Sequence, residues 1–178
     1  MLQEHHFYII DDQYFIDFPD TYLRGNHQEN RPHYFAFQEP SNPGIFWVVP
    51  LSSRIHKYRS IIQKKEATGK PCDTLHIMDV AGKEEVFLIQ DMFPIVKRYI
   101  KREYTISGIP LKLLNENDIK TIRKKVNKVY NLLIRGIKFM PTQPNVMKIR
   151  DELLKRIAVE EVLSLKEIAA TSDNQSES

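Results

Sequence analysis

Residues 45–58 read Ile45-Phe46-Trp47-Val48-Val49-Pro50-Leu51-Ser52-Ser53-Arg54-Ile55-His56-Lys57-Tyr58 and hold the strongest signals in this chain. The first five residues are apolar, which predicts a buried β-strand. After Pro50 come two hydroxyl side chains, followed by a histidine and two cations. Hydroxyls, an imidazole and fixed positive charge without a nearby carboxylate suit the binding of a phosphodiester. We therefore expect the end of this strand to handle RNA.

A second strand is predicted just upstream, in the segment Asn30-Arg31-Pro32-His33-Tyr34-Phe35-Ala36-Phe37. This segment also opens with polar and basic side chains. The sequence Ser41-Asn42-Pro43-Gly44 between the two apolar runs is typical of a turn. The two runs therefore predict an antiparallel hairpin with a longer loop. We expect the two polar strand ends to build one site, and that site to cleave RNA.

The order of the predicted elements indicates an α+β fold. Short strands are expected at residues 6–10, 33–39, 45–51, 74–80 and 84–90. Residues 54–65 fit either a basic helix or an extended loop, and apolar residues recur at helical spacing within 95–103, 115–137 and 145–169. These elements predict one domain over residues 1–170: a small, partly open antiparallel β-barrel with packed helices, two long ones at its C-terminal end. Residues 171–178 are small and polar and are expected to form a disordered tail.

The charge of the chain is unevenly distributed. The net charge of its 178 residues is +3, yet residues 1–40 carry seven acidic and two basic side chains, so the remainder has a positive excess of 8. This excess gathers at residues 54–65, 97–102 and 120–128. Clustered Lys and Arg favour a surface that binds a polyanion, although a solvated helix face would explain any one cluster.

Several classes of function have little support in the sequence. No apolar run approaches the roughly 20 residues of a membrane span, and the N-terminus lacks the pattern of a signal peptide. The single cysteine, Cys72, cannot form an internal disulfide or, without a second cysteine, a typical zinc site. Neither a phosphate-binding loop nor a dinucleotide fingerprint is present. We therefore expect a cytoplasmic protein with no metal, no cofactor and no membrane partner.

The catalytic candidates follow from what RNA cleavage without a metal requires. When a ribose 2′-hydroxyl attacks the adjacent phosphorus, a proton must be accepted, a proton must be donated, and the phosphorane charge must be stabilised. Histidine suits proton transfer near neutral pH. The candidates are Ser53, Ser52, His33, His56 and Lys57. Simpler alternatives stay open, because serines after Pro50 could cap the next helix and His33 could be a hydrogen-bonded histidine on an edge strand.

The RNA-binding candidates are mostly the clustered cations. They are Arg31, Arg54, Tyr58, Arg59, Lys64, Lys65, Lys97, Arg98, Lys101, Arg102, Lys120 and Lys124. Aromatic residues such as Tyr34 and Tyr58 near cations could also stack bases, as in single-strand binders. A non-catalytic RNA- or protein-binding module is therefore the alternative to an enzyme.

Four segments in a fixed order carry a resemblance to a known family. They are Phe7-Tyr8-Ile9-Ile10-Asp11-Asp12, Asn30-Arg31-Pro32-His33-Tyr34-Phe35, the apolar run that ends in Pro50-Leu51-Ser52-Ser53, and Gln90-Asp91-Met92-Phe93-Pro94-Ile95. Their order resembles the endoribonuclease toxins of type III toxin–antitoxin systems, the ToxN/AbiQ superfamily, and within it the CptN-like branch. The resemblance covers roughly residues 6–140, and it rests on the ordered set rather than on one motif.

The resemblance implies a barrel core related to MazF toxins, and metal-independent RNA cleavage, often at adenine-rich sites, that leaves a 2′,3′-cyclic phosphate and a 5′-hydroxyl. It also implies an antitoxin that is itself RNA: a small pseudoknot that the toxin cuts from a tandem-repeat transcript and that blocks the active site in a closed toxin–RNA oligomer. Such systems act against phage through abortive infection. A ribonuclease toxin with a protein antitoxin is a weaker alternative.

The family's functional residues carry over unevenly. Its hydroxyl pair matches Ser52 and Ser53, and the second serine is the stronger candidate. His33 stands where some relatives have lysine. Relatives also place a lysine soon after the serine pair, but Ile55 holds that position here, so His56 or Lys57 would have to serve instead.

Overall fold

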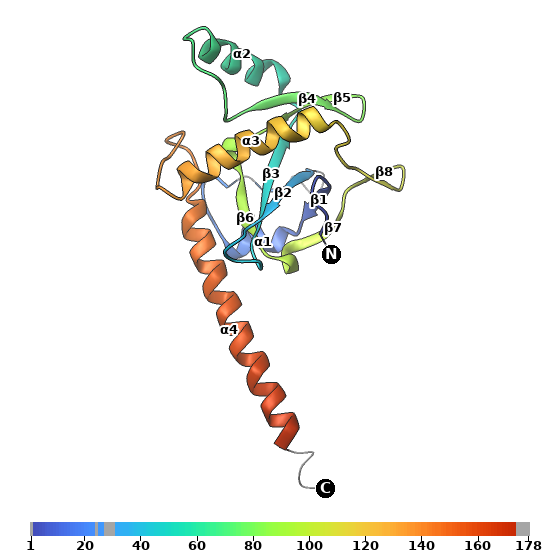
Figure 1. Ribbon diagram of the computed structural model, residues 1–178, viewed down its shortest axis with the longest axis vertical. Helices are drawn as coiled ribbons and strands as arrows, with labels where there is room; N and C mark the ends of the chain where they lie inside the picture. Colours follow the sequence, from blue (N-terminus) through green and yellow to red (C-terminus); the bar gives the residue numbers. More distant parts are fainter. Residues whose placement is uncertain (1, 24, 27–30, 174–178) are drawn as a thin grey trace.

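The computed structural model describes residues 2–23, 25–26 and 31–173, which form an open antiparallel sheet with helices packed against it (Figure 1). The strands are β1 (Phe7–Ile10), β2 (His33–Gln38), β3 (Phe46–Ser52), β4 (His76–Val80), β5 (Lys83–Phe87), β6 (Phe93–Ile95), β7 (Ile100–Glu103), β8 (Thr105–Ile106) and β9 (Ile109–Pro110). The α-helices are α1 (Asp12–Asp17), α2 (Ile55–Glu66), α3 (Glu116–Leu133) and α4 (Val146–Asp173), with short 3-10 turns η1 (Ile89–Asp91) and η2 (Lys97–Tyr99). The predicted α+β class and the two long C-terminal helices are confirmed.

Strand β3 is the centre of the sheet. The strand order is β4-β5-β3-β2-β1-β7, and β6 pairs with β3 in addition. Two strands pair with one edge of β3: β6 with Phe46–Val48, and β5 with Leu51 and Ser52. The other edge pairs with β2, as predicted from the hairpin. The end of β3 therefore lies between the β4–β5 hairpin and the start of β2.

Two apolar clusters hold these elements. The larger one joins the main sheet to α1, α3 and the first half of α4, and it contains Trp47 and the α3 residues Ile122, Val126 and Val129. The smaller one packs α2 on β4 and β5 through Tyr58, Cys72, Leu75, Val86 and Leu88. Figure 1 shows α2 above the β4–β5 hairpin, apart from the main body. Helix α2 is thus carried by the hairpin that borders the end of β3.

Helix α4 is tied to the β2–β3 turn by a buried ion pair. Arg150 donates to both carboxylate oxygens of Glu39, which is fully buried and also accepts a 3.1 Å hydrogen bond from the indole of Trp47. Gly44 lets α4 pack close, because a Cβ built there would lie 3.0 Å from Ile157. Beyond these contacts, α4 projects away from the body of the molecule (Figure 1).

One sequence prediction is corrected by the structure. The helical spacing at 95–103 does not give a helix: residues 97–99 form the turn η2, and residues 100–103 form β7. Pairing explains this result, because β7 covers the edge of β1 that would otherwise expose unpaired backbone groups. Helix α4 extends to Asp173, and the rest of the predicted tail, residues 174–178, lies outside the described part of the chain. Residues 54–65, which fitted a helix or a loop, form a helix.

Candidate functional site

The two serines lie at the junction of β3 and α2. Ser52 is the last residue of β3, and its Oγ accepts a 3.3 Å hydrogen bond from the backbone N–H of Arg54. Ser53 is exposed. Helix α2 begins after Arg54 without a side-chain cap, in contrast to α1 and α3, which Asp11 and Asn115 cap. Ser53 therefore does not cap the start of α2, and its side chain lies at the surface.

Arg31 lies beside this junction because of the strand register. His33 pairs with Pro50, so the residues before β2 run alongside the end of β3. The Nε of Arg31 donates a 3.0 Å hydrogen bond to the carbonyl oxygen of Leu51. The two polar strand ends that the sequence singled out are thus side by side, with a guanidinium one residue from the serine pair.

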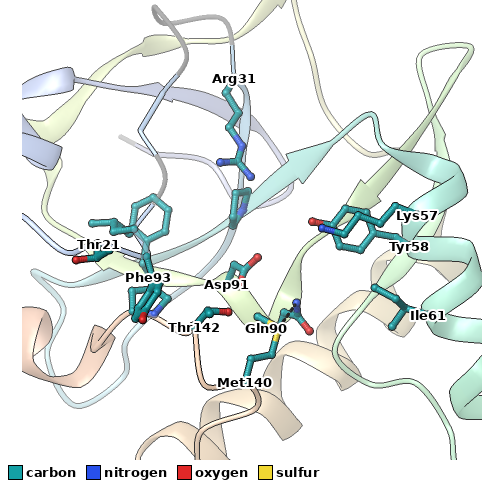
Figure 2. A pocket seen from close by; sticks show the side chains of 14 residues that line it. Thr21, Arg31, Lys57, Tyr58, Ile61, Gln90, Asp91, Phe93, Met140 and Thr142 are labelled. Atoms are coloured by element: carbon teal, nitrogen blue, oxygen red, sulfur yellow. Dashed lines mark hydrogen bonds between the residues drawn. The ribbon is translucent and has the colours of Figure 1, made fainter.

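A pocket of about 310 Å3 opens between α2 and the main body. Figure 2 shows Arg31, Lys57 and Tyr58 around it, with Asp91 between them. Its lining consists of Thr21, Tyr22, Leu23, Arg31, Pro50, Lys57, Tyr58, Ile61, Gln90, Asp91, Phe93, Met140, Thr142 and Pro144. Three predicted residues, Arg31, Lys57 and Tyr58, therefore meet in one cavity although they come from two separate segments, whereas Ser52 and Ser53 are not part of its lining.

Helix geometry explains which cations of α2 face the pocket. Lys57 and Ile61 line it, and residues four and seven positions after Lys57 lie on the same helix face. Lys64 therefore continues this face and is exposed. Arg59 lies on another face, where its guanidinium donates to both carboxylate oxygens of Glu84 at 2.8 and 2.9 Å. Arg54 and His56 are exposed at the start of the helix, outside the pocket lining.

Asp91 is a pocket residue that the sequence analysis did not select. It belongs to η1 and contributes a carboxylate to a cavity that otherwise has cations, hydroxyls and apolar walls. Its only sequence signal was its place in the segment Gln90–Ile95, which carried part of the family resemblance. Spacing alone could not show that η1 folds against the pocket.

The structure does not place His33 beside Ser53 at the surface, as the sequence prediction assumed. The ring is fully buried, packs edge-on against Phe93 with the ring centroids 5.4 Å apart, and lies behind the pocket wall. Both ring nitrogens face backbone without a well-formed hydrogen bond among the described residues. Burial, reinforced by the positive charge of Arg31, lowers the pKa of His33 to about 3. A buried neutral imidazole has no direct path to a proton of bound RNA, so His56 and Lys57 are better placed for proton transfer.

The cations on β7 lie on a strand that β1 and β2 separate from β3. Tyr8 pairs with both His33 and Glu103, so three strand spacings separate Glu103 from Pro50. At about 4.8 Å per spacing this is roughly 14 Å along the sheet. Lys101 and Arg102 are exposed on β7. Lys97 is exposed on η2 and borders a hollow with Gln38 and Phe46, at the opposite end of β3 from Ser53, while Arg98 forms an ion pair with Glu160 of α4.

The remaining candidate cations lie on α2 and α3, away from the pocket lining. Lys120 and Lys124 are exposed on α3, and Lys120 lies 3.9 Å from Glu116. Lys65 is half-buried on α2. None of these three lines the pocket in the part of the chain that the structure describes. Across residues 2–23, 25–26 and 31–173 no group of three His, Cys, Asp or Glu side chains is placed to share a metal ion, and none of the helices there is long and apolar enough to cross a bilayer.

Comparison with known proteins links this chain to solved toxin structures. No model of a protein family matches the sequence, and the search of curated proteins found no match either. A toxin of a bacterial type III toxin–antitoxin system, ToxN, described as selectively inhibited by a non-coding RNA pseudoknot, has a TM-score of 0.58 at 16% identity, over 86% of this chain and 98% of its own. AbiQ, a lactococcal anti-phage endoribonuclease of the type III system, has a TM-score of 0.58 at 11% identity, over 86% and 99%.

The toxin MazF-mt6 of Mycobacterium tuberculosis overlaps less, with a TM-score of 0.40 at 10% identity, over 71% of this chain and 96% of its own. At these identities the likeness to ToxN and AbiQ shows that the chain shares their fold. It covers nearly the whole length of both proteins.

Proposed function

We propose that this chain is an endoribonuclease toxin of a type III toxin–antitoxin system. The observation that carries the proposal is the meeting of Arg31 and Lys57 in one pocket, at the point where β3 ends in the serine pair and α2 begins uncapped. The shared fold with ToxN and AbiQ supports the same conclusion, because AbiQ is an endoribonuclease and both are toxins of type III systems.

In this proposal the RNA phosphate binds between Ser53 and the start of α2. Backbone N–H groups at a helix N-terminus and the helix dipole favour an anion. The Ser53 hydroxyl donates to a non-bridging oxygen, and Arg31 supplies a planar pair of donors beside it. These groups stabilise the extra negative charge of the phosphorane in the transition state.

The reaction is cleavage of RNA by its own ribose. The 2′-oxygen forms a bond to phosphorus while the bond from phosphorus to the 5′-oxygen breaks, which leaves a 2′,3′-cyclic phosphate and a 5′-hydroxyl. One group accepts the 2′-hydroxyl proton, and a second donates a proton to the 5′-oxygen. We assign these two transfers to His56 and Lys57, which follow Ser53 on the first turn of α2. The expected cleavage sites are adenine-rich, as the family resemblance implies.

The proposed inhibitor is a small pseudoknot RNA that the toxin itself processes in the cytoplasm. The inhibition of ToxN by an RNA pseudoknot supports this part. We propose that toxin and RNA form a closed oligomer in which the RNA occupies the site beside Ser53. The exposed cations on α2 and β7 would contact its phosphates.

The test is cleavage of defined adenine-rich RNA by the purified protein in the presence of a chelator. We expect strand breaks whose 5′-hydroxyl ends can be labelled directly by polynucleotide kinase. Ser53→Ala should reduce the cleavage rate by roughly 100-fold or more, the usual effect of losing one donor to a developing oxyanion. Ser60→Ala is the matched control, because Ser60 is an exposed serine on the neighbouring helix α2 and does not line the pocket.

Two results would count against the proposal. If the wild-type protein shifts the RNA in a gel but leaves it intact, the chain is an RNA-binding module. If Ser53→Ala cleaves as fast as Ser60→Ala, the site has been placed wrongly. Tandem repeats upstream of the gene would support an RNA inhibitor, and a small upstream reading frame in their place would favour a protein one.

A further inference from the structure

The pocket that Arg31 and Lys57 line is chemically mixed. These two residues bring positive charge to it (Figure 2). Pro50, Phe93 and Met140, among others, give it apolar walls. An apolar wall does not suit a phosphate, but it suits the flat face of a base. The cavity of about 310 Å3 lies at the lower end of the range for small-ligand sites, so it can enclose one nucleotide rather than a helix.

Asp91 brings a carboxylate into this pocket, and Gln90 adds an amide. An ionised carboxylate only accepts hydrogen bonds, and it repels a phosphate. Its partner in RNA must therefore be an uncharged N–H or O–H donor. The exocyclic amino groups of adenine, guanine and cytosine are such donors, whereas uracil has no amino group and offers only its ring N3–H.

The backbone around Asp91 is held firmly. Its N–H donates to the carbonyl oxygen of Leu88 at 2.9 Å, and the N–H of Gln90 donates to that of Thr74 at 3.0 Å. Gln143 donates its side-chain amide to the carbonyl oxygen of Gln90 at 2.9 Å, which ties η1 to the loop before α4. A carboxylate on such a fixed segment is pre-organised, so little conformational entropy is lost on binding.

We propose that this pocket binds one base of the RNA next to the cleaved linkage, and that Asp91 selects a base with an exocyclic amino group. The inference rests on the proposed function and adds a specificity-determining residue to it. The apolar walls favour a base over a ribose, whose 2′-hydroxyl is another uncharged donor in RNA. Arg31 and Lys57 then hold the adjoining phosphate.

The test removes single amino groups from the RNA. A short substrate is made with purine riboside in place of adenosine, inosine in place of guanosine, or pyrimidin-2-one riboside in place of cytidine, at each position flanking the cut. At one position we expect the wild-type kcat/KM to fall roughly 10- to 100-fold, the effect of losing a hydrogen bond to a charged group. In Asp91→Ala the same removal should change kcat/KM less than about threefold, because the acceptor is already absent.

The outcomes separate this inference from the proposed function. The base subsite is overturned if removing an amino group changes wild-type kcat/KM at no position. It is also overturned if the removal lowers kcat/KM in Asp91→Ala as much as in the wild type. Sensitivity to 2′-deoxy substitution alone would place a ribose against Asp91 and also overturn it. If no RNA is cut, the proposed function fails. The base subsite can then still be tested, by measuring how the same substitutions change the equilibrium affinity of the RNA for Ser53→Ala. A thermal melt of each variant confirms that it is folded.

Discussion

The Nε of Arg31 donates a 3.0 Å hydrogen bond to the carbonyl oxygen of Leu51. This bond crosses from the start of β2 to the end of β3, so it fixes the guanidinium next to the serine pair. In Figure 2 the guanidinium points toward the pocket that Lys57 also lines. The backbone of one strand thus orients a cation that is carried by its neighbour.

Arg31→Lys tests whether this orientation matters. Lysine keeps the positive charge but carries its three donors on one nitrogen, so it cannot bond Leu51 and present a planar pair of donors to a phosphate at once. We expect kcat/KM for RNA to fall roughly 10- to 100-fold while the thermal midpoint changes little. Arg135→Lys, at an exposed position after α3, is the control and should leave the rate unchanged. Equal rates for the two variants would mean that charge alone is required at Arg31.

The salt dependence of RNA binding distinguishes two cations on α2. Lys57 lines the pocket, whereas Arg59 is held by Glu84 on another face of the helix. Each phosphate contact on a single strand contributes about 0.7 to the slope of log affinity against log salt. We expect Lys57→Gln to lower this slope by about that amount and Arg59→Gln to leave it nearly unchanged. A larger change for Arg59→Gln would place the RNA on the β4–β5 face instead.

Much of the fold could be predicted because local signals agreed with tertiary pairing. The turn at residues 41–44 and its flanking apolar runs gave the β2–β3 hairpin, and with it the neighbouring positions of Arg31 and Ser53. The apolar spacing after Asn115 gave α3. In both places the periodicity is long or the turn chemistry is strong, so no distant contact had to be known.

The rest depended on contacts between residues far apart in the sequence. Residues 95–103 have helical spacing, but β1 offered an unpaired edge, and strand pairing outweighed that preference. The burial of His33 follows from Phe93, sixty positions later. Asp91 reaches the pocket only because η1 is tied to Thr74 and Gln143. None of these relationships leaves a periodic trace in the sequence.

The ion pair between Glu39 and Arg150 should contribute strongly to stability. Burial alone would raise the pKa of Glu39, but hydrogen bonds from Arg150, Trp47 and Asn42 lower it to about 2. Removing one partner of a buried pair leaves an uncompensated charge. We expect Glu39→Gln to reduce the free energy of unfolding by about 3 kcal/mol in chemical denaturation.

Two further variants control this measurement. Arg156→Gln removes a partly exposed pair with Asp17 and should cost at most about 1 kcal/mol. The double variant Glu39→Leu with Arg150→Met leaves no buried charge and should regain much of the lost stability. A loss for Glu39→Gln no larger than that for Arg156→Gln would show that the buried pair is not an anchor of α4.

His33 should make the protein less stable in mild acid. Its pKa is about 3 in the folded chain, because of burial and then the nearby charge of Arg31, against an ordinary value of 6.5. Between these two pH values His33 binds a proton in the unfolded chain but not in the folded chain. The free energy of unfolding therefore falls as pH falls below 6.5. From pH 7 to pH 5 this amounts to about 2 kcal/mol. Burial lowers the pKa of His5 and His76 too, so they add in the same direction.

His33→Gln isolates the contribution of this ring, because glutamine keeps a polar side chain of similar size and does not titrate. The free energy of unfolding is measured in urea at pH 7 and at pH 5. Its decrease between the two pH values should be about 2 kcal/mol smaller in the variant than in the wild type. Glu39 does not confound this window, since its pKa shift acts only below about pH 4.5. An unchanged pH dependence in His33→Gln would mean that His33 gains access to water and protons in solution, and it would then return to the catalytic candidates.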